Sequence, residues 1–398
     1  MNNAAMTRTD GSRARRLAWV VVATSMALTL LPAPHALAAP GVTLKASATK
    51  LIFGQTTRLF GRIEPAAQGE TVSIIDGAAQ VLATDKTDAD GRYSVRIEPR
   101  QNVTVRARWI AALSTPIQLK VKPVIVVKLR KPLLFGRARI RGRVNPVHPG
   151  ERVQVSLVRG RRSIATKNVR LRSGHWFSTS FAVRKPGTYK AKILFDDADH
   201  VASVVYSAGK TTSLPYLGVG SRGRMVRLLE KRLGDLQYHL TGKNDGYFDY
   251  RTSDAMIAFN KIKGRARVGS VSTSTWTALA NARVPQPRHR RGTHIEIDQT
   301  RQILMTVRNG KVTNVVHTST GASGTATYDG THYIHRKVGG YSPGRLYYPS
   351  YFDGLRAIHG WPEVPTYPAS HGCARVPMWA AQHLYRIATM GMKVYVYH

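Results

Sequence analysis

The feature that most constrains the fold is an internal repeat between residues 40 and 208. A pattern of Gly, Pro and aromatic positions returns at an offset of 81 to 82 residues, which predicts two copies of one structural unit. The repeated residues are Phe53-Gly54, Gly61-Arg62, Pro65 and Gly69-Glu70, and then Phe135-Gly136, Gly142-Arg143, Pro146 and Gly150-Glu151. Runs that alternate apolar and polar residues lie between Gly, Pro and Asp turns, as is typical of half-buried antiparallel strands. We predict β domains over residues 40–122 and 123–208.

Each copy resembles the immunoglobulin-like sandwich modules of bacterial surface proteins. Strand-like runs such as Thr71–Ile75 and Arg152–Ser156, and a turn at Asp88–Gly91, carry the resemblance together with the repeat length of about 80 residues. It implies two antiparallel sheets packed face to face in each copy. The chain is therefore expected to be a mainly β, multidomain protein with two Ig-like β-sandwiches.

Positive charge dominates the chain of 398 residues, with 60 Lys and Arg against 22 Asp and Glu, and implies an anionic partner. In the second copy, Arg137, Arg139, Arg141 and Arg143 recur with a period of two, so a strand would present them on one face. Two interpretations remain open. The stripe contacts anionic wall polymers, or it is a solvated face whose charge protects an edge strand from aggregation.

The N-terminus predicts export. A basic region is followed by an apolar run of 15 residues, Leu17 to Leu31, and by the small-residue site Ala36-Leu37-Ala38. This is the pattern of a signal peptide, residues 1–38, cleaved after Ala38. The run is shorter than the roughly 20 apolar residues of a membrane-spanning helix, and Arg15-Arg16 leaves twin-arginine export as a second route. We expect a protein of the cell wall or a periplasmic-type space, without a nucleic-acid partner.

Helical periodicity begins near residue 212. Val226, Leu229 and Leu233 follow one helix face, and two further apolar patterns predict a three-helix domain over residues 212–282. The sequence of this region resembles a peptidoglycan-binding domain. Three segments carry the resemblance: Leu217-Gly218-Val219-Gly220-Ser221-Arg222-Gly223, Asn244-Asp245-Gly246-Tyr247-Phe248 and Trp276-Thr277-Ala278-Leu279. It departs from the usual pairs at Leu229-Glu230, Gln237-Tyr238, Phe248-Asp249 and Phe259-Asn260. Residues 283–292, rich in Pro and Arg, are predicted to be an extended linker.

The last domain, residues 293–398, is predicted to be β-rich with one C-terminal helix. Apolar runs on both sides of Asn309-Gly310 indicate a hairpin, because both turn residues tolerate positive φ. Met378 to Thr389 suits a helix with Gly391 as its C-terminal cap, followed by a closing strand at Val394–Val396.

This domain contains the only cysteine of the chain. Cys373 lies in Ser370-His371-Gly372-Cys373-Ala374-Arg375, fourteen residues after His359-Gly360. A thiolate is a strong nucleophile, and a nearby imidazole activates it. Gly372 permits close approach of backbone N–H groups to an oxyanion, and Arg375 offers a fork for a carboxylate. The alternatives are an inert buried thiol and a zinc site built from Cys373, His359 and His371, which lacks a fourth ligand.

His-Gly followed by Ser-His-Gly-Cys-x-Arg resembles the signature of the L,D-transpeptidase catalytic domain. The resemblance implies Cys373 as nucleophile, which is acylated by the third residue of a tetrapeptide stem with release of D-alanine, and His359 as general base. The remaining implied site residues surround the oxyanion and the substrate: Gly360, Ser370, His371, Gly372 and Arg375. It implies peptidoglycan stem peptides as partners, β-lactams, carbapenems especially, as covalent inhibitors, and no metal or organic cofactor.

Two other outcomes stay open. Water instead of an amine would resolve the acyl-enzyme in an L,D-carboxypeptidase, and a vestigial catalytic domain would make the chain a non-catalytic wall-binding scaffold. The sequence departs from the family at Ala374, where a larger aliphatic residue is usual, and at Thr327-Tyr328-Asp329-Gly330 in place of Thr-Pro-x-Gly. These changes leave the catalytic atoms in place.

Overall fold

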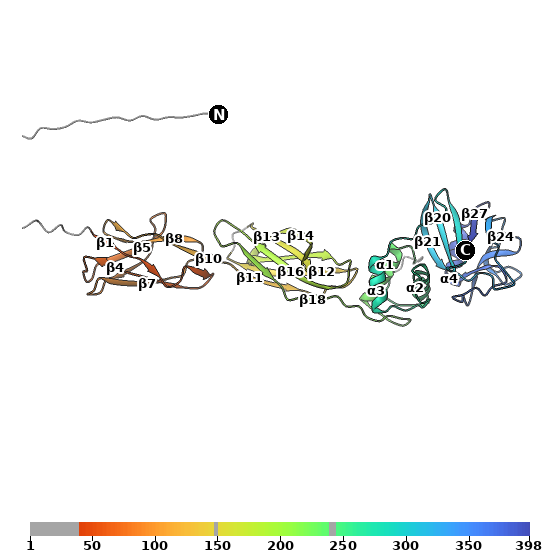
Figure 1. The fold of residues 1–398 in the computed structure, drawn as a ribbon, viewed down its shortest axis with the longest axis horizontal. Helices are drawn as coiled ribbons and strands as arrows, with labels where there is room; N and C mark the ends of the chain where they lie inside the picture. Colours follow the sequence, from red (N-terminus) through yellow and green to blue (C-terminus); the bar gives the residue numbers. More distant parts are fainter. Residues whose placement is uncertain (1–39, 147–149, 239–243) are drawn as a thin grey trace, which may run out of the picture.

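The protein is described by a computed structural model covering residues 40–146, 150–238 and 244–398. The predicted signal peptide lies outside the described residues. The fold is mainly β, and its parts follow one another in a row: two all-β units, a helical unit, and a C-terminal unit of strands and one helix (Figure 1). Among the described residues, no helix has the length and apolar character needed to cross a membrane.

The first unit consists of two sheets. In one, β4 pairs with β1, β2 and β7; in the other the order is β3-β10-β8-β5-β6, with β9 beside β8. The strands are β1 (Gly41–Val42), β2 (Lys45–Ala46), β3 (Lys50–Ile52), β4 (Thr57–Glu64), β5 (Thr71–Ile75), β6 (Val81–Lys86), β7 (Arg92–Ile97), β8 (Val103–Trp109), β9 (Ala112–Leu113) and β10 (Ile117–Lys122). Buried aliphatic side chains and Trp109 form the core of this unit.

The second unit repeats this plan with sheets β11-β12-β15 and β14-β13-β16-β17, with β18 beside β16. Its elements are β11 (Val124–Leu129), β12 (Arg137–Asn145), β13 (Arg152–Arg159), β14 (Arg162–Arg170), a 3-10 turn (Ser173–His175), β15 (Trp176–Ala182), β16 (Thr188–Phe195), β17 (Ser203–Tyr206) and β18 (Lys210–Thr211). The repeated glycines explain part of the shared sequence. A Cβ at Gly61 would overlap the Thr43 carbonyl and lie 2.8 Å from the Tyr93 hydroxyl, and one at Gly142 would overlap the Phe177 ring and the Val126 carbonyl, so both copies need glycine where a neighbouring backbone and an aromatic side chain approach the strand.

The arginine stripe lies on β12, which is the middle strand of its sheet and pairs with both β11 and β15. All four arginines are exposed and alternate with the buried Ala138, Ile140, Gly142 and Val144. The predicted one-sided stripe is therefore confirmed, but the edge-strand explanation is wrong. A strand hydrogen-bonded on both sides has no free edge to protect.

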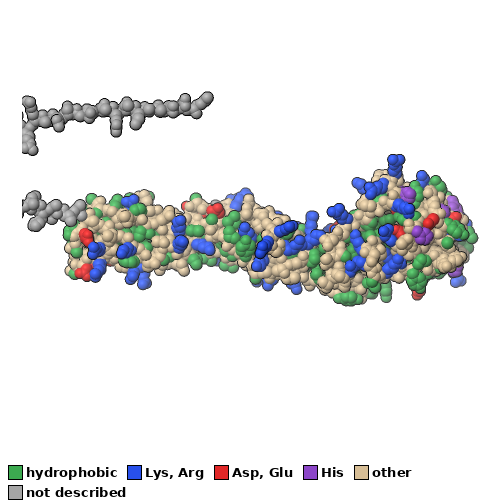
Figure 2. Space-filling model, viewed as in Figure 1, with side chains coloured by type: hydrophobic (Ala, Val, Ile, Leu, Met, Phe, Trp, Pro, Cys, Tyr) green, Lys and Arg blue, Asp and Glu red, His purple; other side chains and the backbone are tan. Residues whose placement is uncertain are grey.

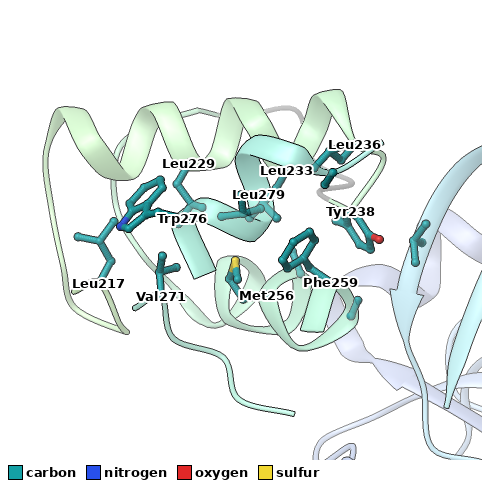
Figure 3. Close-up of a cluster of buried hydrophobic side chains, with 14 of the residues drawn as sticks. Leu217, Leu229, Leu233, Leu236, Tyr238, Met256, Phe259, Val271, Trp276 and Leu279 are labelled. Carbon is teal, nitrogen blue, oxygen red and sulfur yellow. The ribbon is translucent and has the colours of Figure 1, made fainter. Parts of the chain in front are cut away.

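The three predicted helices are present: α1 (Arg224–Asp235), α2 (Tyr250–Ile262) and α3 (Thr273–Asn281). Asp249 caps the start of α2 and Ser272 the start of α3, since each side chain accepts a backbone N–H of the first turn. Their apolar side chains point toward one another around Trp276, and Tyr238 lies at the side of the cluster nearest the next strands (Figure 3).

The C-terminal unit has two sheets, β21-β20-β19-β27-β22 and β23-β24-β25-β26, and α4 packs on the second. The elements are β19 (His294–Asp298), β20 (Ile303–Arg308), β21 (Lys311–His317), β22 (Gly330–Tyr333), β23 (Arg336–Lys337), β24 (Tyr347–Asp353), β25 (Arg356–Trp361), β26 (Ala374–Pro377), α4 (Met378–Ile387) and β27 (Lys393–Tyr397). Asn309 and Gly310 both have positive φ, as predicted for the hairpin. The helix is capped by Ala388, not Gly391, which has a positive φ in the turn that precedes β27.

One hydrophobic core spans the helical unit and the first sheet of the C-terminal unit. Met305, Val307, Val312 and Val315 of β20 and β21 belong to the same buried cluster as the helix side chains. The segment 283–292 has no regular structure, as predicted, but it is fixed to the C-terminal unit: the backbone N–H groups of its residues 288 and 289 donate to the Glu296 carboxylate at 2.9 and 2.7 Å. The helical and C-terminal units therefore pack as one body.

Candidate active site

Two neighbouring parallel strands bring the predicted catalytic residues together. In the register of β25 and β26, His359 lies beside Arg375 and Ile358 lies beside Ala374. Because successive side chains of a strand alternate, His359 and Arg375 share one face of the sheet, and Cys373 directly precedes β26. Ile358 and Ala374 point the other way, into the core beneath the sheet. The alternation thus separates the reactive side chains from the core of the domain.

Cys373 is a free, half-buried thiol immediately before β26. Its Sγ accepts the backbone N–H of Ala357 at 3.4 Å and lies 3.9 Å from the Leu355 carbonyl oxygen. Burial raises the pKa of the thiol, while the Ala357 N–H and the nearby Arg375 and Arg356 charges lower it less strongly. The resting form is therefore the neutral thiol, which needs a base before it can attack.

His359 is 2% exposed, and its Nδ1 lies 3.0 Å from the Gly360 carbonyl oxygen. A carbonyl only accepts, so Nδ1 carries the proton and Nε2 keeps its lone pair. Burial lowers the pKa of His359 to about 4; the Gly360 carbonyl opposes this shift and the Arg375 charge adds to it. The ring is therefore neutral near pH 7, as a general base must be.

A hydroxyl closes the turn that carries the thiol. Ser370 Oγ accepts the Gly372 N–H at 3.1 Å and donates to the Cys373 carbonyl at 2.6 Å. Gly372 has a φ of +105°, and a Cβ there would lie 2.8 Å from Arg356 Nε. Both the backbone conformation and the limited space therefore favour glycine at this position. Of the residues that the resemblance places around the oxyanion and the substrate, Gly372 already donates its N–H to Ser370. Within the described part of the chain, the N–H groups of His371 and Cys373 have no protein acceptor.

Arg375 and His371 differ in their surroundings. Arg375 donates to the Ala369 carbonyl at 3.1 Å and its guanidinium lies 5.0 Å from the centre of the Trp361 ring, so it also holds the loop before the cysteine. The His371 side chain is exposed. His359 meets the Trp361 ring edge-to-face at 5.7 Å, so Trp361 contacts both His359 and Arg375.

Sequence reasoning missed two residues at the site. Thr327 is 2% exposed; its Oγ1 donates to the Gly372 carbonyl and accepts the Gly321 N–H, both at 2.9 Å. Arg356 donates to the Ala326 carbonyl at 3.0 Å and lies over the Tyr328 ring. Thr327 was noted only as part of a departure from the family pattern, and nothing local in the sequence signals its contact with a residue 45 positions away.

The described residues contain no group of three or more His, Cys, Asp or Glu side chains placed to hold a metal ion. His359 and Cys373 are present at the site, and the hydrogen bond of His359 Nδ1 to a carbonyl leaves one nitrogen for chemistry. The arrangement suits a thiol and a neutral imidazole brought together by adjacent strands.

Residues 292–396 match the family model of the L,D-transpeptidase catalytic domain, YkuD. An L,D-transpeptidase from Xylanimonas cellulosilytica is 34% identical; the match covers 46% of this chain and 98% of that one, with a TM-score of 0.44. The catalytic domain of an E. faecium L,D-transpeptidase acylated by ertapenem is 24% identical over 27% and 99% of the two chains, with a TM-score of 0.24. An L,D-transpeptidase from Mycobacterium smegmatis is 11% identical over 70% and 99%, with a TM-score of 0.24. No curated protein matches the chain.

The family match identifies residues 292–396, the two sheets with the thiol turn, as an L,D-transpeptidase catalytic domain. Through this domain the chain belongs to the L,D-transpeptidase family.

Proposed function

We propose that the protein forms 3-3 cross-links in peptidoglycan through an acyl-enzyme on Cys373. The observation that carries the proposal is the pairing of β25 with β26, which places the buried, neutral His359 on the strand next to the one that Cys373 directly precedes. A neutral base beside a protonated thiol suits attack on a carbonyl with proton transfer at the moment of attack. The donor substrate is a tetrapeptide stem.

The reaction has two halves. Cys373 Sγ attacks the carbonyl carbon of stem residue 3 while its proton passes to His359 Nε2. The tetrahedral oxyanion faces the free N–H groups of His371 and Cys373, and it collapses to a thioester as His359 returns the proton to the departing D-alanine amine. In the second half an amine of a neighbouring stem attacks the thioester, His359 takes the amine proton, and the thiolate is then reprotonated.

Arg375 and Ser370 act on the stem and the turn. Arg375 has one nitrogen bound to the Ala369 carbonyl and further N–H groups for a stem carboxylate or carbonyl. Ser370 holds the turn through its two hydrogen bonds. The Gly360 carbonyl orients the His359 ring through Nδ1.

We also propose that the protein is exported and held in the wall by its second β unit. Residues 123–208 contain 18 Lys and Arg against 4 Asp and Glu, whereas residues 40–122 contain 12 against 7. On the exposed face of the three-stranded sheet, the register places Lys128 beside Arg141 and leaves the face without a carboxylate. In the view of Figure 2, Lys and Arg side chains are spread along the length of the described chain, with few Asp and Glu side chains among them.

A phosphodiester wall polymer is the partner that this face fits. Alternate residues of a strand are about 6.8 Å apart, so the four arginines of β12 form a row of guanidinium forks that suits phosphate oxygens. A hollow of about 1080 Å³ beside β15 carries more cations, among them Arg152, Lys167, Arg170 and Arg172. Because β12 has no free edge, edge protection does not account for these charges.

Product analysis tests the enzymatic proposal. The chain without residues 1–38 is incubated with disaccharide-tetrapeptides, with a Cys373→Ala variant as control, and products are identified by mass spectrometry. We expect cross-linked dimers that lack one D-alanine and depend on Cys373. Tripeptide monomers alone would make the protein an L,D-carboxypeptidase, and unchanged substrate would leave a non-catalytic wall-binding scaffold. β-Lactam inhibition is expected for the same reason, and ertapenem acylates the E. faecium relative.

A further inference from the structure

The loop that joins the two catalytic strands is held partly by the helical unit. Residues 362–373 connect β25, which carries His359, to Cys373. Several groups of this loop are bonded to the rest of the protein, among them the carbonyls of Val364, Thr366 and Tyr367, and the N–H groups of Ala369 and Ser370, which share the Thr320 carbonyl. The helical unit makes the contact to the Thr366 carbonyl directly and supports the contact to the Val364 carbonyl.

Arg267 makes one of these contacts directly. It lies in the segment after α2, and its guanidinium donates to the carbonyl of Thr366 and, at 3.0 Å, to the carbonyl of Thr300. Thr300 belongs to the turn between β19 and β20, so a single side chain of the helical unit ties the loop to the first sheet. The planar fork of arginine suits two acceptors at once.

Lys261 supports the second contact from beneath. It ends in the core between the two units, 3% exposed, and its Nζ lies 2.9 Å from the Gln302 carbonyl oxygen, 3.0 Å from that of Thr318 and 2.7 Å from His317 Nδ1. His317 Nε2 lies 2.8 Å from the Val364 carbonyl oxygen. Because that carbonyl accepts, Nε2 carries the proton, and Nδ1 accepts from the lysine.

The hydrogen bonds around Lys261 match a charged lysine, whereas its burial favours the neutral amine. Two carbonyls and an imidazole lone pair are three acceptors, and an ammonium has three N–H donors. Burial lowers the pKa of Lys261 to about 6 and the pKa of His317 to about 3, so it opposes the charge near pH 7. The three polar contacts fix the end of the side chain inside the core.

Lys261 is also linked to β26 through the hydrogen bonds of Thr318. Thr318, whose carbonyl accepts from Lys261, donates its Oγ1 to the Arg375 carbonyl at 2.7 Å. Ser319 exchanges two backbone hydrogen bonds with Arg375, at 3.1 and 2.9 Å. Hydrogen bonds therefore connect α2, through residues 317–320, to both ends of the loop and to β26. This strand begins at the residue after Cys373.

We propose that the helical unit is a built-in support of the active site, and that Lys261 and Arg267 are positioning residues for acyl transfer. They set the loop between His359 and Cys373, and therefore the relative position of base and nucleophile. The inference rests on the proposed function of Cys373. On this proposal the helical unit, which resembles a peptidoglycan-binding domain, contributes to the reaction itself. It must therefore stay docked on the catalytic domain.

The test compares two positioning variants with a matched packing variant in the chain lacking residues 1–38. Lys261→Met keeps the length of the side chain without charge, and Arg267→Ala removes the fork. Val312→Ala makes a cavity in the same interdomain core but touches none of the loop contacts. The measurements are the acylation rate of Cys373 by ertapenem, followed by intact-protein mass, and hydrogen exchange of residues 362–373.

We expect Lys261→Met and Arg267→Ala to slow acylation by about 10- to 100-fold, the scale of a small misplacement of reacting groups. Both should also raise exchange in the loop, and Arg267→Lys should recover part of the rate. Val312→Ala should lower Tm while its acylation rate stays within about twofold of the parent. Arg267 is only half-buried, so its variants keep the test informative should Lys261→Met fail to fold.

Two results would overturn the inference: acylation and loop exchange unchanged in Arg267→Ala, or an equal loss of rate in Val312→Ala. A parent protein that ertapenem does not acylate would instead reject the proposed function. Loop exchange remains interpretable in that case, because it does not depend on turnover.

Discussion

Thr327 Oγ1 donates a hydrogen bond to the carbonyl of Gly372, the residue directly before the nucleophile, at 2.9 Å. The same hydroxyl accepts the Gly321 N–H, so one buried side chain ties the loop before β22 to the turn that holds the thiol. Gly372 is fixed from the other side by Ser370. The turn is therefore positioned before any substrate binds, as catalysis by preorganised groups requires.

Thr327→Val is expected to lower the acylation rate of Cys373 by about 10-fold or more, because a misplaced nucleophile loses its alignment with the carbonyl. It should also cost about 1–3 kcal/mol of stability, since buried partners are left without a hydrogen bond. Ertapenem acylation and urea unfolding measure the two effects. Thr327→Ser, which keeps the hydroxyl, is the control; equal losses in both variants would show that the methyl group and not the hydrogen bond matters.

Gly372→Ala is expected to abolish acylation. The φ of +105° disfavours any side chain, and the new Cβ would meet Arg356 Nε at 2.8 Å and the Ala326 carbonyl at 3.2 Å. Gly220→Ala provides the comparison, since that glycine has a φ of +90° with nothing within 4 Å of a Cβ. It should lose about 1–3 kcal/mol of stability from backbone strain alone and acylate normally. Normal acylation by Gly372→Ala would contradict the described turn.

The pH dependence should identify His359 as a base that is already neutral. Burial lowers its pKa to about 4, so the acylation rate should show no ionisation between pH 6 and 7 and should decline only near pH 4. Because the pKa of Cys373 is raised, the acylation rate should increase again in alkaline solution, where the thiolate forms. The rate of ertapenem acylation from pH 4 to 10 measures both. An inflection near 6.5 that disappears in His359→Gln would reject this assignment.

The same shift affects stability. Between the folded pKa of about 4 and the unfolded value of 6.5, only the unfolded chain binds the His359 proton, so stability falls as the pH decreases through this range. The slope from this group is at most about 1.4 kcal/mol per pH unit. Urea unfolding at pH 5 and 7.5 should therefore show a smaller pH effect in His359→Gln than in the parent protein. Parallel changes would mean that other groups carry the effect.

Several parts of this structure could be predicted from the sequence. The repeated Gly61 and Gly142, the three helices and the Asn309-Gly310 hairpin leave local signals, because turn chemistry and periodicity act over a few residues. That His359 and Cys373 belong to one site is implied by the family signature. All of these depend on short-range patterns.

Other parts depend on contacts that no local pattern carries. Lys261 ends an amphipathic helix, where lysine normally faces water, yet it lies in a core completed by another unit. The position of β12 in the middle of its sheet depends on which strands pair with it, and alternation alone does not give this. Thr327 and Arg356 reach the nucleophile turn across 45 and 16 residues, so their roles emerge only from the tertiary fold.

The basic face of the second β unit predicts selective binding of phosphate polymers. Replacing Arg137, Arg139, Arg141 and Arg143 by Gln should weaken binding to inorganic polyphosphate by at least about 10-fold and make binding less sensitive to salt, because fewer counterions are released. The matched control replaces Arg58, Arg62, Arg92 and Arg96 on the equivalent face of the first unit, where Arg62 and Arg92 already pair with acids. Fluorescence anisotropy at several salt concentrations measures both.

Equal losses in the two quadruple variants would show that polyphosphate senses only the overall charge of the chain. Polyglutamate and vesicles containing phosphatidylglycerol serve as the other probes. Stronger, face-dependent binding to either of them would replace the phosphodiester polymer with a carboxylate polymer or a lipid surface.

The central claim, that Cys373 is the acylated nucleophile of an L,D-transpeptidase, is tested most directly by the mass of the protein after incubation with ertapenem. We predict the addition of one ertapenem molecule, mapped by peptide mass spectrometry to the segment with Cys373, and no addition to Cys373→Ala. An unmodified parent protein, or an adduct that persists in Cys373→Ala, would contradict the account.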